Sequence, residues 1–384
     1  MRNRIYLDHA ATTPTSGKVL EAMLPFFTEI SGNASAVYGD GRDARKAVER
    51  ARKQTAEAIG AEPREIIFTA GGSESDNLAI KGTAFAMKEQ GRHIITTAVE
   101  HPAVLNTCKW LEKQGFEVSY IPPDTAGRID PEDVRRAIRR DTILISVMAA
   151  NNEIGTIEPV AEIGAIAREH GILFHTDAVQ AVGSIPVNVR TWNADLLSLS
   201  AHKFYGPKGI GAMYLRRGTR LDPLIHGGEQ ERGLRAGTEN VPGIVGLGQA
   251  IQDAAAGLAE NAEKVRMLRD RLMNGIREAI PDVKVNGSEE NRLPNNCSLS
   301  FDRIDGEALL LRMDLAGIAG SSGSACTAGS QEISHVLKAI GLTDGQAKGS
   351  LRLTTGTGNT EDEISQAISA VKEIVEDLRR LFRS

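Results

Sequence analysis

The feature that most constrains the fold is a regular alternation of short apolar runs with longer amphipathic segments between residues 65 and 215. The apolar runs predict strands, and segments such as 74–91, 101–115 and 160–171 have the apolar spacing of helices. Nearly continuous apolar strands separated by helices are typical of a mostly parallel sheet covered on both faces. We therefore predict an α/β fold. The seven predicted strands lie in REIIFTAGG, RHIITTAV, FEVSYIPP, DTILISVMA, GILFHTDAV, DLLSLSAHK and GIGAMYLRR.

The sequence changes character after about residue 257. A long charged helix follows, then short strands, a helix around residues 306–316 and a final amphipathic helix. This order indicates a smaller α+β domain, and a chain of 384 residues is long enough for two domains. We predict a large domain over residues 16–255 and a small C-terminal domain over residues 256–384, with residues 1–15 packing on the small domain.

The charge balance argues against two classes of partner. With 45 Lys and Arg against 50 Asp and Glu, the net charge of -5 gives no electrostatic reason for direct binding to nucleic acid or to an anionic membrane. The longest apolar run, residues 143–150, is far shorter than the roughly 20 residues of a membrane helix. Asp8 and His9 interrupt the first apolar stretch, so no secretory signal follows. We expect a cytoplasmic protein.

The three cysteines are too few and too scattered for a disulfide framework or a zinc site. Cys108 lies in a helical pattern and Cys297 in a strand pattern, so both are expected to be small buried hydrophobic residues. Cys326 differs, because it lies in the small-residue stretch SSGSACTAGS, residues 321–330. Ordering ten such residues would cost on the order of 10–20 kcal/mol with no large apolar side chain to offset it. We expect this loop to be mobile.

Polar residues follow several of the predicted strands directly, at the edge where ligands bind to open parallel sheets. A glycine turn that opens a helix suits a phosphate group. Each of these residues alone has an ordinary structural explanation, such as a helix cap or a buried histidine. Together, a phosphate cradle, a carboxylate, an imidazole and a lysine are the groups needed to hold pyridoxal phosphate. The residues that follow the strands include Gly72, Ser73, Glu100, His101, Asn151, Asn152, Asp177, Gln180, His202 and Lys203.

Nine motifs in this order resemble the cysteine desulfurases, which are pyridoxal-phosphate enzymes of the class V aminotransferase group with the type I fold. The resemblance runs from Tyr6 to Gly356 and so covers nearly the whole chain. It implies an enzyme that removes sulfur from L-cysteine, leaving L-alanine and a persulfide on an enzyme cysteine. The motifs are YLDHAATTP, AGGSESDNLAIKG, EHPAV, NNEIGT, HTDAVQAVG, SLSAHKFYGPKGIG, RAGTENVPGI, SSGSACT and SLRLTTG.

The resemblance also implies a role for each matching residue. Lys203 would bind the cofactor covalently, Asp177 would pair with the ring nitrogen, and His101 would stack on the ring and transfer protons. Cys326 would accept the sulfur. Gln180 would contact the ring hydroxyl oxygen, and the phosphate would be held by Gly72, Ser73, Ser200 and His202. Asn152 would contact the cofactor and, together with Arg352, would bind the substrate carboxylate. Thr238 would reach the phosphate of the neighbouring subunit.

The contact through Thr238 implies a homodimer with shared active sites. The expected partner is a sulfur acceptor, such as an iron–sulfur scaffold or a tRNA-thiolation enzyme, and no metal is expected. Selenocysteine cleavage and other class V reactions such as amino transfer remain alternatives, and amino transfer would not need Cys326. A non-catalytic sulfur-pathway scaffold is a further alternative, but it would not require Lys203 and Asp177.

Overall fold

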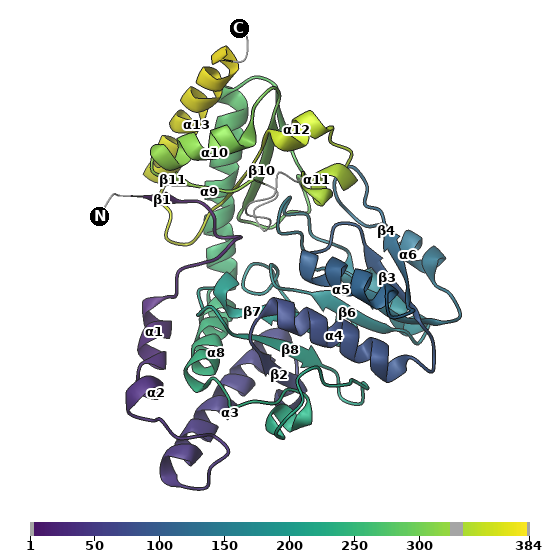
Figure 1. Cartoon of the computed structure of the whole chain (residues 1–384). Coiled ribbons are helices and arrows are strands. Elements are labelled where there is room, and N and C mark those ends of the chain that lie inside the picture. Colours follow the sequence, from purple (N-terminus) through teal and green to yellow (C-terminus); the bar gives the residue numbers. More distant parts are fainter. Residues whose placement is uncertain (1–3, 323–332, 382–384) are drawn as a thin grey trace.

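The computed structural model describes residues 4–322 and 333–381. A seven-stranded sheet with the order β2-β8-β7-β6-β5-β3-β4 lies at its centre (Figure 1). Within this sheet only β8 runs antiparallel to its neighbours. The predicted α/β fold with a mostly parallel sheet is confirmed, and all seven predicted strands are present. They are β2 (Ile66–Thr69), β3 (His93–Thr97), β4 (Glu117–Ile121), β5 (Thr142–Ser146), β6 (Leu173–Asp177), β7 (Leu196–Ser200) and β8 (Gly211–Leu215).

Helices cover both faces of this sheet, and alternate residues of one strand serve the two faces. On β2, Ile66 and Phe68 join the core that contains α3, α7 and α8, whereas Ile67 joins the core beneath α4 and α5. Every residue of β2 is therefore buried. The helices around this sheet are α1 (Gly17–Met23), α2 (Pro25–Thr28), α3 (Gly39–Ile59), α4 (Gly72–Met87), α5 (Pro102–Glu112), α6 (Pro131–Ala137), α7 (Val160–Glu169) and α8 (Val241–Ala256).

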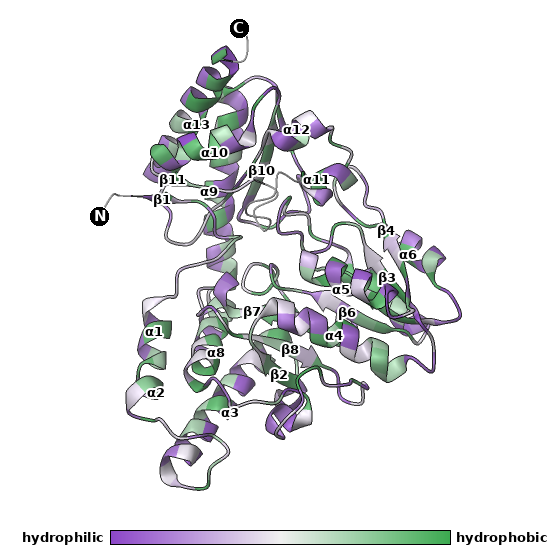
Figure 2. Ribbon diagram, in the orientation of Figure 1, coloured by the Kyte–Doolittle hydropathy of each residue, from purple (hydrophilic) through white to green (hydrophobic). Residues whose placement is uncertain are grey.

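A second hydrophobic core lies around a three-stranded antiparallel sheet with the order β12-β10-β9. Helices α9 and α13 carry hydrophilic and hydrophobic stretches (Figure 2), as expected for helices with one face on a core. Strands β1 and β11 form a separate parallel pair. The remaining elements are β1 (Ile5–Tyr6), α9 (Leu258–Ala279), β9 (Val283–Val285), β10 (Asn296–Phe301), α10 (Gly306–Leu315), β11 (Ile318–Ala319), α11 (His335–Ala339), α12 (Asp344–Lys348), β12 (Ser350–Thr354) and α13 (Glu361–Leu381).

The division into two domains near residue 255 stays a prediction. Ile5 and Leu7 belong to the second core, but Val336 and Leu337 of α11 belong to the core of the seven-stranded sheet. The C-terminal part of the chain therefore contributes to both cores. No helix in residues 4–322 and 333–381 has both the length and the apolar character to cross a membrane.

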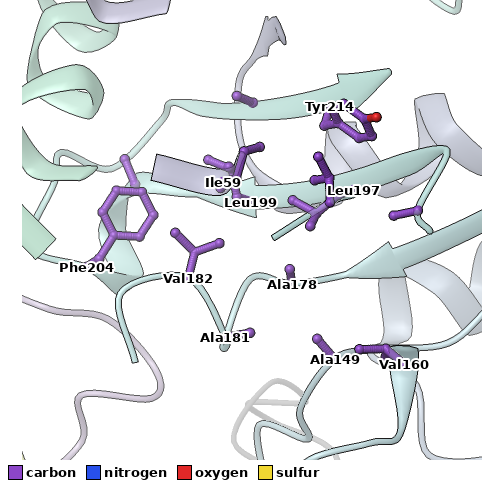
Figure 3. Packing of buried hydrophobic residues seen from close by; sticks show 14 of the residues in the cluster. Ile59, Ala149, Val160, Ala178, Ala181, Val182, Leu197, Leu199, Phe204 and Tyr214 are labelled. Atoms are coloured by element: carbon purple, nitrogen blue, oxygen red, sulfur yellow. The ribbon is translucent and has the colours of Figure 1, made fainter. Parts of the chain in front are cut away.

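Buried apolar residues anchor the segments that follow β6 and β7 (Figure 3). Ala178 and Ala181 are fully buried, and each comes directly after one of the polar residues predicted to bind the cofactor. After β7, Ala201 and Phe204 are buried on either side of the dipeptide His202-Lys203. Because apolar and polar residues alternate here, burial of the apolar ones fixes where the polar side chains emerge.

Candidate active site

A cavity of about 260 Å³ brings together ten of the predicted site residues. They come from segments spread over most of the chain. Nine of them meet because the carboxyl ends of parallel strands share one edge of the seven-stranded sheet, whereas Arg352 comes from β12 of the three-stranded sheet. Ala10, Ala11, Asp76, Met148 and Val179 complete the lining. The ten predicted residues are Gly72, Ser73, His101, Asn152, Asp177, Gln180, Ser200, His202, Lys203 and Arg352.

Lys203 ends the short 3-10 turn that follows β7, and its amine contacts the N-terminal segment of the chain. Nζ donates hydrogen bonds to the carbonyl oxygens of Ala10 and Ala11, the latter at 2.9 Å. The oxygen of Ala10 also accepts a hydrogen bond from Nε2 of Gln180 at 3.0 Å. The N-terminal segment therefore forms one wall of the cavity and fixes both side chains.

Asp177 is the last residue of β6 and is only 5% exposed. Its Oδ1 accepts a hydrogen bond from the backbone N–H of Val179 at 2.9 Å. Burial raises the pKa of Asp177, whereas His101 and Lys203 oppose the rise because they favour the charged form. Asp177 is thus a buried acid with two basic groups nearby, which suits a partner for a protonated ring nitrogen.

His101 is the N-cap residue of α5. Its Nδ1 accepts a hydrogen bond from the backbone N–H of Ala103 at 3.1 Å. Burial lowers the pKa of His101, and the nearby Asp177 only partly offsets this. The ring is therefore neutral near pH 7 and carries its proton on Nε2, the nitrogen that the helix cap does not use.

The N-terminus of α4 forms the end of the cavity that suits an anion. The helix begins at Gly72, and a Cβ atom there would lie 2.7 Å from Cγ2 of Val179, so only glycine fits without a shift. The first N–H groups of a helix have no partner within the helix and attract phosphate. Ser73, Ser200 and His202 line the same cavity. Burial, with Lys203 and Lys208 nearby, lowers the pKa of His202 to about 4.

Arg352 lies on β12 and is only 2% exposed. Its Nη1 donates to the backbone oxygen of Asn152, and its Nη2 donates to Oδ1 of Asp8, each at 2.9 Å. The guanidinium is therefore held by two parts of the chain that are distant in sequence. A planar, fixed guanidinium at a cavity wall is suited to bind a carboxylate.

Thr238 does not line this cavity. It lies with Arg235 at a separate cavity of about 240 Å³, where Nε of Arg235 pairs with Glu74 of α4 at 2.9 Å. Within one subunit Thr238 is thus not brought together with the other predicted residues. Its contact with the phosphate of a neighbouring subunit stays a prediction.

Cys326 falls within residues 323–332, outside the described residues, so its role and the expected mobility of its loop stay predictions. The predicted burial of the other two cysteines is confirmed. Burial raises the pKa of Cys108 and of Cys297 to about 12, so neither is a thiolate near neutral pH. In the described part of the chain, no group of three or more His, Cys, Asp or Glu side chains could hold a metal ion.

Two acidic residues near the site were not predicted. Asp76 lines the cavity, is 1% exposed, and its Oδ1 has no hydrogen-bond partner among the described residues. Its position one helical turn after Gly72 would have placed it on the same helix face. Asp8 contacts Arg352 from 344 residues away, and no local pattern indicates such a pair.

The fold and the cavity define the class of protein, because a lysine, a buried acid and a helix N-terminus meet at the carboxyl edge of a mostly parallel sheet. This is the arrangement of the type I fold of pyridoxal-phosphate enzymes. A family model described as aminotransferase class V matches residues 5–367. The chain therefore belongs to the class V aminotransferase family, and its relatives place it among the cysteine desulfurases.

Individual relatives are similar over nearly their whole length. The chain is 53% identical to a cysteine desulfurase IscS of Dictyoglomus turgidum, covering 99% of this chain and 97% of the relative. It is 54% identical to a cysteine desulfurase IscS of Methanosarcina thermophila, covering 98% and 93%. Among solved structures, a NifS-like protein is 40% identical with a TM-score of 0.92, covering 97% of this chain and 99% of that protein. A structure of SspA in complex with cysteine is also 40% identical, with a TM-score of 0.81 and coverage of 93% and 100%.

Proposed function

We propose that this cysteine desulfurase uses pyridoxal phosphate to transfer the sulfur of L-cysteine to Cys326, releasing L-alanine. The main observation in support is that Lys203, Asp177, His101 and Arg352 line one cavity. Each has a chemical property that the reaction requires: an amine, a buried acid, a neutral imidazole and a fixed guanidinium. The cysteine in the SspA structure supports L-cysteine as the class of substrate.

The residues at the cavity fit the cofactor. We propose that Lys203 holds it covalently, that Asp177 faces the ring nitrogen, and that the N-terminus of α4 at Gly72 binds the phosphate. The position of Gly72 at the start of α4 and on the cavity wall supports the last assignment, because the first N–H groups of a helix attract phosphate. When bound, pyridoxal phosphate supplies an electron sink for the electrons released at Cα of the substrate.

The chain's own groups then act on the substrate. Arg352, with Asn152, orients L-cysteine through its carboxylate. The amine of Lys203 removes the proton from Cα, and His101, which carries its own proton on Nε2, transfers protons at the substrate. Burial of these groups excludes water and strengthens their electrostatic interactions.

The sulfur transfer balances without an external oxidant. The thiolate of Cys326 attacks the sulfur atom of the substrate, an S–S bond forms, and the C–S bond breaks with its electron pair left on the carbon skeleton. Protonation of that carbon and return of a proton to Cα give L-alanine, and Cys326 holds the persulfide. A thiol of an acceptor protein then takes the sulfur by thiol–disulfide-type exchange.

We also infer a homodimer in the cytoplasm, in which Thr238 of the partner subunit reaches the cofactor phosphate. The location of Thr238 outside the Lys203 cavity of its own subunit supports this inference. The expected acceptor is an iron–sulfur scaffold or a tRNA-thiolation enzyme. Incubation of the persulfide form with each acceptor class would show which one takes the sulfur.

Cys326→Ala tests the proposed function. The variant should keep the visible absorbance of the bound cofactor but lose both alanine production and the persulfide detected by mass spectrometry after addition of L-cysteine. Cys108→Ala and Cys297→Ala are matched controls, because both thiols are buried and un-ionised, and they should retain turnover. Full alanine production by Cys326→Ala would refute the proposal.

Lys203→Ala tests the alternative of a non-catalytic scaffold. Loss of the visible absorbance band of the cofactor in this variant would support an enzyme, because a scaffold would not need a covalently bound cofactor.

A further inference from the structure

The carboxylate of Asp8 and the guanidinium of Arg352 form a largely buried ion pair. Nη2 of Arg352 lies 2.9 Å from Oδ1 of Asp8, and the side chains are 2% and 17% exposed, respectively. Asp8 follows β1, and Arg352 lies in the middle of β12, so the pair joins the two ends of the chain. Arg352 lines the cavity that contains Lys203, but Asp8 does not. The acid therefore stands beside the arginine, outside the cavity.

Both partners are held in place by further contacts. The hydroxyl of Ser321 donates a hydrogen bond to Oδ2 of Asp8 at 2.8 Å, and the backbone N–H of Ser321 donates to the carbonyl of Arg352 at 3.1 Å. On the arginine, Nη1 is used by Asn152, whereas Nε is buried and has no hydrogen-bond partner among the described residues. The guanidinium thus has donor capacity that the described fold leaves unused.

The Asp8 carboxylate already pairs with the guanidinium of Arg352. A ligand carboxylate that binds Arg352 therefore shares the positive charge of the guanidinium with Asp8. Two like charges around one cation repel each other, and the repulsion is stronger in a buried site than in water. Glu153 is a further acid near Arg352, but burial raises the pKa of Glu153 to about 7 and keeps much of it uncharged at neutral pH. Asp8 is therefore the acid that directly opposes a bound carboxylate.

We propose that Asp8 is a positioning residue that acts through Arg352 and limits the affinity of the site for α-carboxylates. It holds the guanidinium in the orientation that meets the substrate, and its negative charge weakens the binding of substrate and product alike. L-alanine, which keeps the carboxylate after the sulfur has left, is thereby released. This inference rests on the proposed role of Arg352 toward the substrate carboxylate.

The test compares two ligands that differ only in the carboxylate, L-alanine and ethylamine. Their dissociation constants are measured on the cofactor-loaded protein by titration of its visible absorbance. Asp8→Asn removes the charge, while its amide can still bond both Arg352 and Ser321. This variant should bind L-alanine at least about fivefold more tightly than the unmodified protein and should bind ethylamine equally well. KM for L-cysteine should fall, and kcat should not rise.

Asp195→Asn is a matched control. Asp195 is 18% exposed, pairs with Arg216 at 2.8 Å, and lies at the other end of the sheet, next to the start of β7. The same substitution there should leave both dissociation constants unchanged, because it removes a similar ion pair far from the cavity. If loss of charge or of stability had a general effect on ligand binding, the dissociation constants of Asp8→Asn and Asp195→Asn would change alike.

Three outcomes would overturn the inference: unchanged or weaker L-alanine binding by Asp8→Asn, equal tightening for ethylamine, or failure of both Asp8→Asn and Asp8→Ser to fold. The last would assign Asp8 to folding instead of ligand affinity. A different result would count against the proposed function itself. If the unmodified protein bound L-alanine no better than ethylamine, Arg352 would not bind the carboxylate.

Discussion

The backbone N–H of Ala103 donates a hydrogen bond to Nδ1 of His101 at 3.1 Å, so the helix cap of α5 selects the tautomer of a proposed catalytic histidine. The proton of the neutral ring is on Nε2 as a result. Burial lowers the pKa of His101 from its ordinary value of 6.5. The neutral form of His101 therefore persists somewhat below neutral pH.

His101→Asn should lower kcat for L-cysteine by about 10²–10⁴-fold, because a group that transfers protons is lost. Asparagine is itself a good N-cap residue, so α5 should remain intact. The acid limb of the pH–kcat/KM profile that belongs to His101 should lie below pH 6.5 and should be absent in the variant. Steady-state kinetics over a pH series measures both effects, and a kcat within tenfold of the original value would contradict the assignment.

Asp76 and Asp177 line the same cavity and allow a direct comparison. Burial and the neighbouring Asp177 raise the pKa of Asp76 well above its usual range, which favours the uncharged form of Asp76. Asp76→Asn should keep kcat within about threefold, because an amide resembles a protonated acid in shape and charge. Asp177→Asn should lower kcat by about 10²–10³-fold, because it removes the partner of the ring nitrogen. Equal losses in the two variants would contradict this division of roles.

Gly72→Ala should weaken binding of the cofactor by at least about tenfold. The added Cβ would lie 2.7 Å from Cγ2 of Val179 and would displace the helix N-terminus that is proposed to bind the phosphate. Gly17→Ala is the matched control, because it also lies at a helix start and a Cβ there meets no atom within 4 Å. Quenching of intrinsic fluorescence on adding pyridoxal phosphate to the cofactor-free proteins would measure both affinities. Similar affinities in the two variants would argue against a phosphate at Gly72.

Glu153 makes the stability of the protein depend on pH. It accepts a hydrogen bond from Ser334, and burial raises its pKa from 4.5 to about 7. Below pH 4.5 both the folded and the unfolded chain carry the proton, and the contribution of Glu153 to stability is complete. Between about pH 4.5 and about pH 7, Glu153 ionises in the unfolded chain but keeps its proton in the folded chain. The free energy of unfolding therefore falls by about 3 kcal/mol over this range.

Glu153→Gln should remove this loss, since glutamine is neutral and still accepts the hydrogen bond from Ser334. Urea unfolding of the cofactor-loaded proteins at about pH 5 and about pH 8.5 would measure it. The variant should lose less stability than the original protein between the two pH values. If both proteins lost the same amount, Glu153 would not be the group responsible.

Much of the seven-stranded sheet could be predicted because its causes are local. Strands such as β5 are short apolar runs, and the glycine turn before α4 marks the start of a helix. The positions of Asp177 and Lys203 followed from the same pattern, because each stands at or just after the end of a strand. The general rule that ligands bind at this edge then predicted that they would meet.

The sequence by itself determined the fold class and most of the cavity residues through periodicity, turn residues and strand ends, which are properties of neighbouring residues; the resemblance to the cysteine desulfurases added the family and residues such as Ser200 and Arg352. Tertiary structure alone decided the pairing of Asp8 with Arg352, which are 344 residues apart. It also decided which nitrogen of His101 carries the proton and that the pKa of Asp76 is raised. Such properties depend on burial and on contacts between distant segments, and these exist only once the chain has packed.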